Sequence, residues 1–531
     1  MSAVTVPEAD QTEAKFPLLL TASLVSSLIV LDSNIVSVSL PTIARWLSAS
    51  FIEIQWVISS YVLTYAALLM AAGSYGDLYG RRRAMLQGLS VFAVASALCG
   101  LAPTSAVLNL ARAAQGVGGA LLLTASLALI TFNFAGPART RAIAFWGASL
   151  GIALTVGPIA GGIITKFLGW RWIFLVNIPI CAGLIYATSR FITESKDTQA
   201  KRLDWPGIST FSIGLAVLIW TLIQGNDSGW TSPTILTRLG LAAVLFAAFT
   251  FLEVRQSRPM VDFGLFGHPT FLGSVFAMLG YGASAQVMVF FLPSFLQNAY
   301  GFEPLLAGVA MIPFAIPMVL APRYTTRLSQ RFSGRALLTT GLLVAAIGNI
   351  AFWQVAKSGF PYGVFAIAMI VAGCGVGLLN GTTVKVMGSA VPPERAGMAS
   401  GLASTTRFIG ILVSIAGLGA VLSDRVRNSF VTAATHAGLD SQAAAKAAKR
   451  IEAGDLSGAL HSVPSGMREQ LHQIGLTAFG DGFAVAALIA TFIAVAAALL
   501  TVSFVRRADT APTPIPKAER PCAKIDCRDP L

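Results

Sequence analysis

Residues Phe16–Pro41 read FPLLLTASLVSSLIVLDSNIVSVSLP, an apolar run that contains one acidic residue, Asp32. At a rise of about 1.5 Å per residue, a helix of this length crosses a bilayer core of about 30 Å. Asp32 then lies about 13 Å inside the Pro41 end of the helix. The stretch therefore predicts a membrane-spanning helix with a carboxyl group buried in it.

A carboxylate at this depth costs at least about 2.5 kcal/mol, and such residues usually face a bundle interior or a wet cavity. Removal from water disfavours the charged form of a carboxyl group, so Asp32 becomes a candidate for gaining and losing a proton. The alternative is a structural acid that is hydrogen-bonded to the nearby hydroxyl groups of Ser33 and Ser37.

The composition extends this reading to the whole chain. Of its 531 residues, 55% are hydrophobic and 11% are charged, whereas soluble proteins carry about 25% charged residues. We predict an all-α integral membrane protein with fourteen spans. The spans are expected at 16–40, 54–76, 84–102, 105–132, 141–165, 171–191, 204–224, 234–254, 270–296, 304–325, 335–355, 361–386, 399–422 and 480–505.

Basic residues gather in the short loops on one side of these spans, which predicts that this side is cytoplasmic. An even number of spans places both termini there. The net charge of +13 is spread over these loops and forms no basic polar domain, so we expect no nucleic-acid partner. The loop residues are Arg81, Arg82 and Arg83; Arg139 and Arg141; Lys196, Lys201 and Arg202; Arg323, Arg327, Arg331 and Arg335; and Arg506 and Arg507.

The spans divide as six, two and six, a plan that recurs in transporters built from two six-helix halves. We expect a cytoplasmic N-terminal segment at 1–15, a six-helix bundle at 16–192, an inserted helix pair at 193–258, a second six-helix bundle at 259–505 and a disordered tail at 506–531. Within the second bundle, 423–480 is predicted to be an outward loop with an Ala-rich helix from Ser441 to Ile451.

No pattern of catalytic or metal-binding residues stands out. Cys99, Cys181 and Cys374 lie singly in apolar spans, and Cys522 and Cys527 lie in the polar tail. No nucleophile–base pair, metal cluster or phosphate-binding loop is evident. We expect no enzymatic activity, no metal and no cofactor.

The loop after the second span is predicted to be a conformational latch, because an acid lies among basic residues and glycines. Asp77 can pair with Arg81 or approach a helix N-terminus across the interface between the halves. Positive-inside topology alone is the alternative. The latch residues are Gly73, Asp77, Gly80, Arg81 and Arg82.

In the fourth span, Arg112, Gln115, Gly116 and Gly119 lie on one helix face. Arg112 lies about 10 Å below the outer end of its span, close to the depth of Asp32. Two opposite buried charges at one depth are expected to interact. We predict that Asp32 and Arg112 couple protons to conformation; a permanent structural ion pair is the alternative.

The fifth span combines small residues with a proline, which permits close helix approach and a bend. We predict an antiport hinge formed by Gly147, Gly151, Gly157, Pro158, Gly161 and Gly162.

Aromatic and amide side chains are the candidate lining of a substrate cavity, although Tyr and Trp near span ends are commonly interfacial anchors. The candidates are Tyr61, Tyr65, Gln115, Trp146, Gln286 and Phe290. Lys385 and Arg407 are candidate buried cations that would favour anions or offset acids.

These stretches resemble the signature motifs of the major facilitator superfamily, and most closely those of its fourteen-helix drug–proton antiporter branch. The resemblance links the Asp77 loop to the superfamily's loop motif, Arg112 with Gln115-Gly116 to proton transfer, and Gly157-Pro158 with Gly161-Gly162 to antiport. Trp170 to Phe174, followed by Asn177-Ile178-Pro179, also resembles this branch. In the first-span motif Asn34, Ser37 and Ser39 depart from the usual Thr, Asn and Ala. The tenth span lacks an acid, which weakens any expectation that divalent organic cations are substrates.

The resemblance implies two six-helix bundles with two inserted central helices, and a proton-coupled antiporter that exports amphipathic drugs or other toxic organic compounds by alternating access. The proton gradient would supply the energy, and the location would be the bacterial inner membrane. The expected partners are an organic small molecule, protons and the lipid bilayer. Export of a native metabolite, a lipid-like molecule or a siderophore is the alternative, and a receptor without transport is a weaker one. The sequence specifies neither the compound, the stoichiometry, the oligomeric state nor any accessory adaptor.

Overall fold

The computed structural model describes residues 15–196, 204–256, 261–391, 396–461, 463 and 465–510. Residues 1–14, Lys201, Arg202 and the tail 511–531 with Cys522 and Cys527 lie outside this range. The described residues form helices and no strands. The α-helices are α2 (Phe16–Leu47), α3 (Phe51–Tyr79), α4 (Arg81–Gly100), α5 (Ser105–Asn133), α6 (Gly136–Phe167), α7 (Trp172–Leu175), α8 (Asn177–Phe191), α9 (Trp205–Ser228), α10 (Pro233–Arg255), α11 (Pro269–Gly280), α12 (Met288–Asn298), α13 (Pro304–Val309), α14 (Ile312–Leu328), α15 (Gly334–Ser358), α16 (Tyr362–Ser389), α17 (Ala396–His436), α18 (Ser441–Glu452), α19 (Leu456–His461) and α20 (Arg468–Phe504). Shorter 3-10 segments are η1 (Phe263–Gly267), η4 (Ser465–Met467) and η5 (Ala508–Thr510), and η2 (Tyr281–Gln286) is π-helical.

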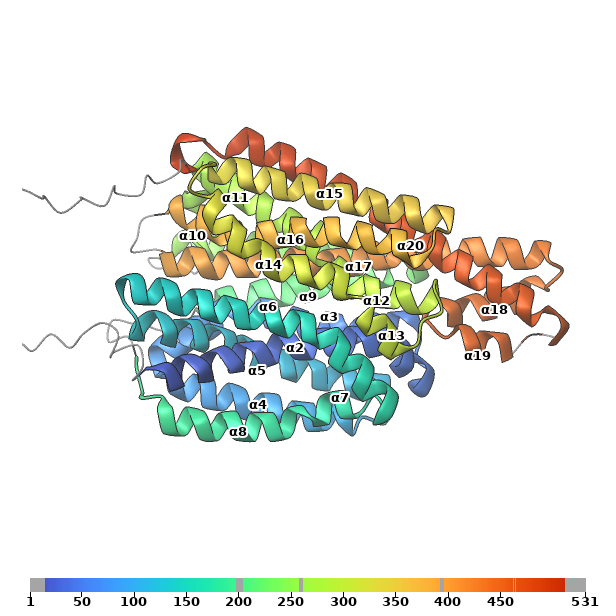
Figure 1. Ribbon diagram of the computed structural model, residues 1–531, viewed down its shortest axis with the longest axis horizontal. Coiled ribbons are helices and arrows are strands. Elements are labelled where there is room, and N and C mark those ends of the chain that lie inside the picture. Colours follow the sequence, from blue (N-terminus) through green and yellow to red (C-terminus); the bar gives the residue numbers. More distant parts are fainter. Residues whose placement is uncertain are drawn as a thin grey trace, which may run out of the picture.

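Fourteen helical spans in the described residues are long and apolar enough to cross a membrane, which confirms the predicted number. Figure 1 shows them lying along one common direction, with the start of α2 and the end of α20 at the same end of the molecule. We call this the terminal end. Helices α18 and α19 project from the opposite end, which we call the cap end.

The spans form two layers (Figure 1). Helices α2 to α8 make the first layer, the N-terminal half, in which α3 and α4 pack on α5 and α2 packs on α6. Helices α11 to α17 and α20 make the second layer, the C-terminal half, in which α15 packs on α16 and α20. The halves meet where α2 contacts α12, α6 contacts α13 and α14, and α3 contacts α17.

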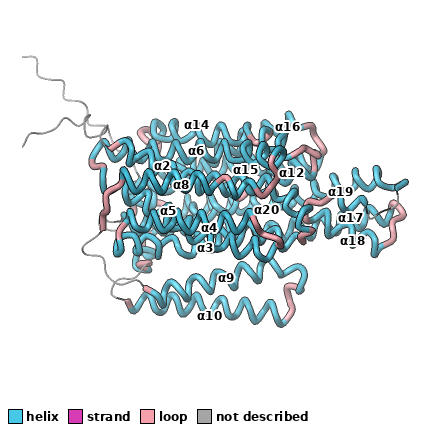
Figure 2. The backbone as a smooth tube through the Cα atoms, turned by 90° about the horizontal axis from the view of Figure 1, so that it is seen from below, coloured by secondary structure: helices cyan, strands magenta, loops and turns pink. Residues whose placement is uncertain are grey.

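Helices α9 and α10 lie beside these layers as a pair (Figure 2). The pair packs together, and α9 also contacts α3 of the N-terminal half and α17 of the C-terminal half. Only 17% of the most apolar window of α10 is buried in the protein, so this helix presents most of its surface to lipid.

The ninth span departs from a regular α-helix, because η2 separates α11 from α12. Two glycines bring this region close to α17. A Cβ atom on Gly282 would collide with the carbonyl oxygen of Arg407, and one on Gly410 would lie 2.7 Å from the carbonyl oxygen of Leu279. Insertions of the π type are frequent at functional sites.

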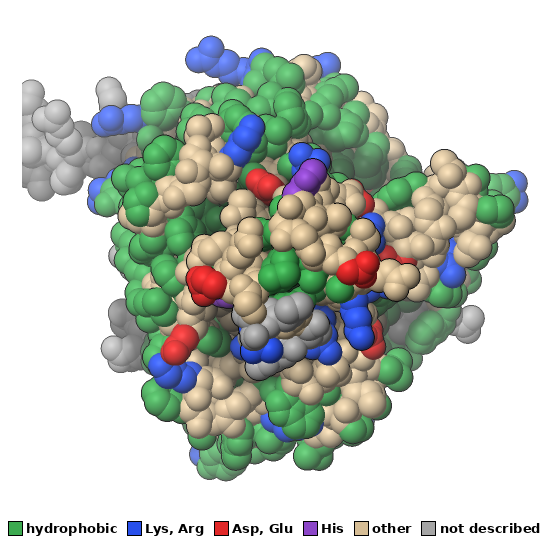
Figure 3. Space-filling model, turned by 90° about the vertical axis from the view of Figure 1, so that its right-hand side faces the viewer, with side chains coloured by type: hydrophobic (Ala, Val, Ile, Leu, Met, Phe, Trp, Pro, Cys, Tyr) green, Lys and Arg blue, Asp and Glu red, His purple; other side chains and the backbone are tan. Residues whose placement is uncertain are grey.

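The segment predicted as an outward loop, 423–480, is helical at both ends. Helix α17 continues to His436 and α20 begins at Arg468. These extensions carry polar side chains, so hydropathy gave no sign of them. The Ala-rich helix is confirmed as α18, which Asp440 caps and which buries Ala444, Ala447 and Ala448. At the cap end, charged side chains of both signs are scattered over the surface (Figure 3).

Candidate functional site

Asp32 and Arg112 form an ion pair in the interior of the N-terminal half. Asp32 comes from α2 and Arg112 from α5, and the Arg112 Nη1 to Asp32 Oδ2 distance is 2.6 Å. Their side chains are 0% and 1% exposed. The two residues, which the sequence places at similar depths, are therefore in direct contact.

Two amide side chains complete the shell around the Asp32 carboxylate. Gln115 Nε2 donates to Asp32 Oδ1 at 3.0 Å, and Asn177 Nδ2 donates to the same oxygen at 2.8 Å. Gln115 also donates to Ser96 Oγ at 2.9 Å and accepts from Arg112 Nη1 at 2.7 Å. Side chains from α5 and α8 thus meet at the one carboxylate that α2 supplies.

The neighbouring serines do not take part in this shell. Ser33 donates to the carbonyl of Ile29 and Ser37 to the carbonyl of Asn34. The alternative reading, in which these hydroxyl groups satisfy Asp32, is wrong, because each serine bonds to the backbone of its own helix instead.

Aromatic rings cover the Arg112 guanidinium. The Tyr61 ring centroid lies 4.2 Å from Arg112 Cζ, and that of Phe174 lies 5.8 Å away. Tyr61 stacks on Tyr65 with centroids 6.0 Å apart, and Tyr65 meets Phe408 of the C-terminal half at 4.6 Å. The rings of Tyr61 and Tyr65 thus extend from the ion pair to the interface between the halves.

The other residues predicted to line a substrate cavity lie at different places in the molecule. Gln115 belongs to the ion-pair network, and Trp146 joins α6 to α2 by donating from Nε1 to Ser26 Oγ at 2.9 Å. Gln286 lies in η2, with its buried Oε1 lacking a hydrogen-bond donor among the described residues. Phe290 is half-buried in α12.

An ion pair joins the end of α3 to the start of α4 at the terminal end. Arg81 donates to Asp77 Oδ1 from Nη2 at 2.8 Å and from Nε at 3.0 Å. Of the two partners considered for Asp77, the structure shows Arg81. Helix α3 continues to Tyr79, so Gly73 and Asp77 are helical and only Gly80 separates α3 from α4. Gly73 is less constrained, because a Cβ there would lie 4.0 Å from its nearest neighbour, Thr124.

Glu194 fixes the start of α4 and was not anticipated from the sequence. Its carboxylate accepts from the backbone N–H groups of Arg82 at 3.0 Å and Arg83 at 3.1 Å. Gly80 adopts a φ of +113°, and a Cβ there would lie 2.6 Å from the Glu194 carboxylate. Arg82 Nη2 also donates to the carbonyl of Ser189 at 2.9 Å. These contacts tie the predicted latch to the end of α8, within the N-terminal half.

The glycines of α6 form a close contact with α2. A Cβ on Gly157 would lie 2.6 Å from Asn34 Cβ, and one on Gly161 would lie 2.8 Å from the carbonyl oxygen of Ile35. Beside them, the hydroxyl groups of Ser39 and Thr165 are 2.7 Å apart. The same stretch of α2 therefore carries Asp32 on one face and the α6 contact on another.

The same helix also contacts α13 of the C-terminal half. A Cβ on Gly162 would lie 2.6 Å from the carbonyl oxygen of Pro304, and Gly308 leaves no room for a side chain beside the carbonyl oxygen of Pro158. Gly151 has ordinary packing space against Val319, and a Cβ on Gly147 would have no neighbour within 4 Å. The close-packed part of the predicted hinge is thus its cap-end portion.

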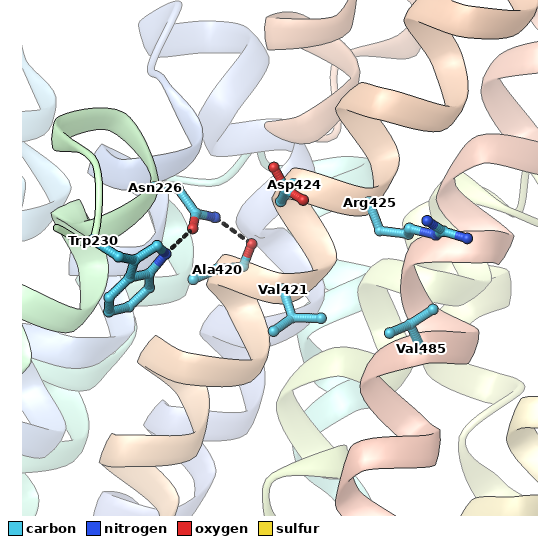
Figure 4. Close-up of a pocket in the computed structure, with 7 residues that line it drawn as sticks. All are labelled: Asn226, Trp230, Ala420, Val421, Asp424, Arg425 and Val485. Atoms are coloured by element: carbon cyan, nitrogen blue, oxygen red, sulfur yellow. Dashed lines mark hydrogen bonds between the residues drawn. The ribbon is translucent and has the colours of Figure 1, made fainter.

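Two hollows lie elsewhere. One of about 670 Å³ lies between the end of α9, α17 and α20, where Asn226 donates to the carbonyl of Ala420 and accepts from Trp230 (Figure 4). Another, of about 510 Å³, lies between α18 and the start of α3. Neither contains a predicted site residue. The described residues also contain no group of three or more His, Cys, Asp or Glu side chains arranged to bind a metal.

Comparison with known proteins identifies the family. The sequence matches the Major Facilitator Superfamily over residues 22–415. The chain belongs to this superfamily. The family resemblance of the sequence motifs is therefore confirmed, and so is the expected all-α fold.

Individual relatives that are named for drug resistance or export also match this chain. The multidrug resistance protein Stp of Mycobacterium tuberculosis is 36% identical over 397 residues, covering 75% of this chain and 74% of that protein. The tetracenomycin C resistance and export protein of Streptomyces glaucescens is 29% identical over 497 residues, covering 92% of this chain and 91% of that protein. The crystal structure of a D-xylose–proton symporter superposes with a TM-score of 0.61 at 14% identity, covering 94% of this chain and 99% of that chain. That last likeness shows the superfamily fold alone.

Asn177 is the partner of Asp32 that the sequence did not indicate. The segment that contains it resembles the superfamily branch, but no role follows from the resemblance. Asn177 is the first residue of α8, one residue after the four-residue helix α7, and its amide donates to Asp32. An asparagine amid apolar residues at a helix start was the available signal.

Proposed function

We propose that this chain is a proton-coupled antiporter that exports amphipathic drugs or other toxic organic compounds across the bacterial cytoplasmic membrane by alternating access. The buried Asp32–Arg112 pair with its amide shell is the observation that carries the proposal. Membership of a transporter superfamily supports it, and so do relatives that are named for multidrug resistance and antibiotic export.

Asp32 is the proposed proton carrier. Its carboxylate now receives three side-chain donors, from Arg112, Gln115 and Asn177. A proton on Asp32 removes the counter-charge of Arg112 and turns one acceptor oxygen into a donor. Because an unpaired buried charge is costly, α2, α5 and α8 must rearrange, and release of the proton reverses this change.

The α2–α6 contact is the proposed route from this event to the rest of the molecule. Asn34 and Ile35 follow Asp32 on α2 and touch the glycines of α6. Helix α6 in turn contacts α13 through Gly162. Small residues let the helix backbones approach closely, so a shift of α2 can be passed through α6 to the C-terminal half.

We infer that this state is closed at the cap end. Gln55 of α3 donates to the carbonyl of Ile415 at 2.7 Å, and Gln297 of α12 donates to the carbonyl of Val38 at 2.7 Å. Lys166 pairs with Glu303 at 2.7 Å, and this hydrogen bond lowers the pKa of the Glu303 carboxyl. These contacts between the halves must separate when the cavity opens toward the cap end.

The latch is proposed to act at the terminal end. Asp77, Arg81 and Glu194 tie the ends of α3, α4 and α8 into one unit. Such a unit can move as a rigid piece when the N-terminal half rocks.

We place the terminal end in the cytoplasm. The short loops there carry the basic residues, in agreement with the positive-inside rule. We also propose that 16–192 and 259–505 are the two moving bundles, and that 193–258 is an inserted pair. Contacts of α9 with both α3 and α17 support a position of the pair beside the interface.

Everted membrane vesicles test the proposal with a panel of dyes, detergents and metabolites. Wild-type vesicles should accumulate amphipathic members of the panel when a proton gradient is applied, and collapse of the gradient should abolish accumulation. Asp32→Asn should abolish it as well, whereas the matched control Asp424→Asn, at the cap end, should retain it. Accumulation of native metabolites alone would favour the alternative cargo, and unchanged accumulation by Asp32→Asn would contradict the proposal.

A further inference from the structure

Arg407 is a cation in a membrane-spanning helix that the proton-coupling site does not use. It lies on α17, is half-buried, and its buried Nε has no hydrogen-bond acceptor among the described residues. Among the described residues, Arg407 forms no ion pair with a carboxylate, whereas Arg112 is paired with Asp32. Intramembrane charges are costly and usually face a partner or a functional cavity.

The position of Arg407 matches that expected for a substrate site. Its carbonyl packs against Gly282, near the middle of the span Pro269–Asn298, and the adjacent Phe408 meets Tyr65, near the middle of α3. Substrate sites of transporters with two repeated halves lie near this midplane, between the halves. By contrast, the other candidate cation, Lys385, is exposed and donates to Ser329 Oγ at 3.2 Å.

The surroundings of Arg407 are aromatic. Its Cζ lies 4.8 Å from the Phe408 ring centroid, and Phe408 meets Tyr65 of the N-terminal half. The Tyr281 hydroxyl and the Arg407 guanidinium lie within interaction range of each other, and Tyr65 is close enough to be influenced by the same charge. Aromatic residues of both halves thus lie near the guanidinium, and no described carboxylate forms an ion pair with it.

The backbone holds Arg407 in this place. Gly282 of η2 packs directly against the carbonyl of Arg407, which leaves no room for a side chain. The π-helical turn that contains Gly282 also contains Tyr281 and Gln286. One irregular segment therefore packs against the backbone of Arg407 and also supplies the Tyr281 ring near its side chain.

We propose that Arg407 binds an anionic group, such as a carboxylate, on the exported compound, while Tyr65, Tyr281 and Phe408 contact its apolar part. The inference rests on the proposed function and narrows its cargo to compounds that carry an acidic group on an aromatic or apolar body. A guanidinium binds a carboxylate through two parallel hydrogen bonds. The stack of Tyr65 on Tyr61, which in turn covers Arg112, then places the cargo one aromatic pair from the proton site.

A pair of rhodamine dyes tests this inference, one with a free carboxylate and the other its ethyl ester. Fluorescence anisotropy with purified protein in detergent gives both dissociation constants. We expect wild type to bind the acid at least tenfold more tightly than the ester. Arg407→Gln should weaken acid binding at least tenfold and change ester binding less than twofold, and Arg407→Lys should be intermediate. The matched control Lys385→Gln removes the same charge from an exposed site and should change neither.

Equal wild-type affinities for the two dyes, including the absence of binding of both, would overturn the inference, as would an equal loss of both in Arg407→Gln. Unfolding temperatures that match wild type show that the variants are folded. The binding ratio needs no proton gradient, so it is independent of the vesicle test. A protein that prefers the acid but transports nothing would contradict the proposed function alone.

Discussion

Asp32 joins three helices of the N-terminal half, because its own helix α2 meets donors from α5 and α8 at one carboxylate. A buried ion pair adds little net stability, since both charges have lost their water. Removing one partner is different, because the remaining charge then lacks compensation. The pair is thus well suited to a conformational switch, because protonation or deprotonation of Asp32 changes the net charge at the point where three helices meet.

This view predicts a non-additive result for the pair. Arg112→Ala should lower the free energy of unfolding by about 3–5 kcal/mol, because it leaves Asp32 buried and unpaired. The double variant Asp32→Asn with Arg112→Ala should lose less than the single variant, since no charge remains. Thermal unfolding in detergent measures both. A double variant that loses the sum of the two single effects would show that the two side chains do not interact.

A second prediction at residue scale concerns Gly80. Its φ of +113° is unfavourable for any residue with a Cβ, and the Glu194 carboxylate fills the space where the Cβ would lie. Gly80→Ala should therefore destabilise the protein by roughly 1–3 kcal/mol, measured as a lower unfolding temperature. Gly73→Ala is the matched control, with its nearest neighbour 4.0 Å away. Equal unfolding temperatures for the two variants would remove Gly80 from the account of the latch.

At the scale of elements, the glycine motif of α6 and the close contacts of that helix do not coincide. The run of glycines and Pro158 predicted one smooth face, but close backbone contact occurs at Gly157, Gly161 and Gly162 and not at Gly147. Spacing along a helix gives the face of a residue, but it does not show where a neighbouring helix diverges. The close contact of α6 is therefore shorter than the motif.

This difference predicts opposite outcomes for two alanine variants. Gly162→Ala places a Cβ 2.6 Å from the Pro304 carbonyl oxygen of the other half, and it should reduce proton-driven dye accumulation in vesicles at least tenfold. Gly147→Ala meets no neighbour and should stay within twofold of wild type. Comparable activity of the two variants would show that the α6–α13 contact does not move during transport.

Helix α18 contains an acid whose protonation should control how firmly it packs on α17. Burial raises the pKa of Glu452 to about 7, although Ser423 donates to its Oε2 at 2.9 Å and Arg427 lies 4.0 Å from its Oε1. Asp227 opposes ionisation and Lys449 favours it. The folded protein therefore holds a proton that the unfolded chain releases above a pKa of about 4.3.

The sign of the resulting pH dependence follows from this difference. Because the folded state binds more protons between about pH 4.3 and 7, the stability of the docked helix falls as the pH rises through that window. Hydrogen exchange of the α18 amides, corrected for intrinsic rates, should show stronger protection at pH 5 than at pH 8. In Glu452→Gln the protection should be nearly independent of pH. Stronger protection of wild type at pH 8 would contradict the assignment.

Much of the whole molecule follows from its sequence, for physical reasons. Apolar runs matched to a bilayer gave the fourteen spans, and the depths of Asp32 and Arg112 in their spans indicated their pairing. Hydropathy could not show that α17 and α20 extend beyond the predicted spans, because those turns are polar. Asn177 and Glu194 act through contacts between segments that are distant in sequence. Helical spacing alone cannot predict such contacts.

The two halves touch at the cap end through Gln55, Gln297 and the Lys166–Glu303 pair. In the proposed antiporter, binding of the cargo is linked to release of the proton from Asp32. Purified protein should show this link even without a membrane. Proton release on addition of a transported dye, measured in weakly buffered detergent solution, tests this most directly. Wild type should release protons in proportion to the dye bound, and Asp32→Asn should bind the dye without releasing any. Equal release by the variant, or none by wild type, would contradict the account.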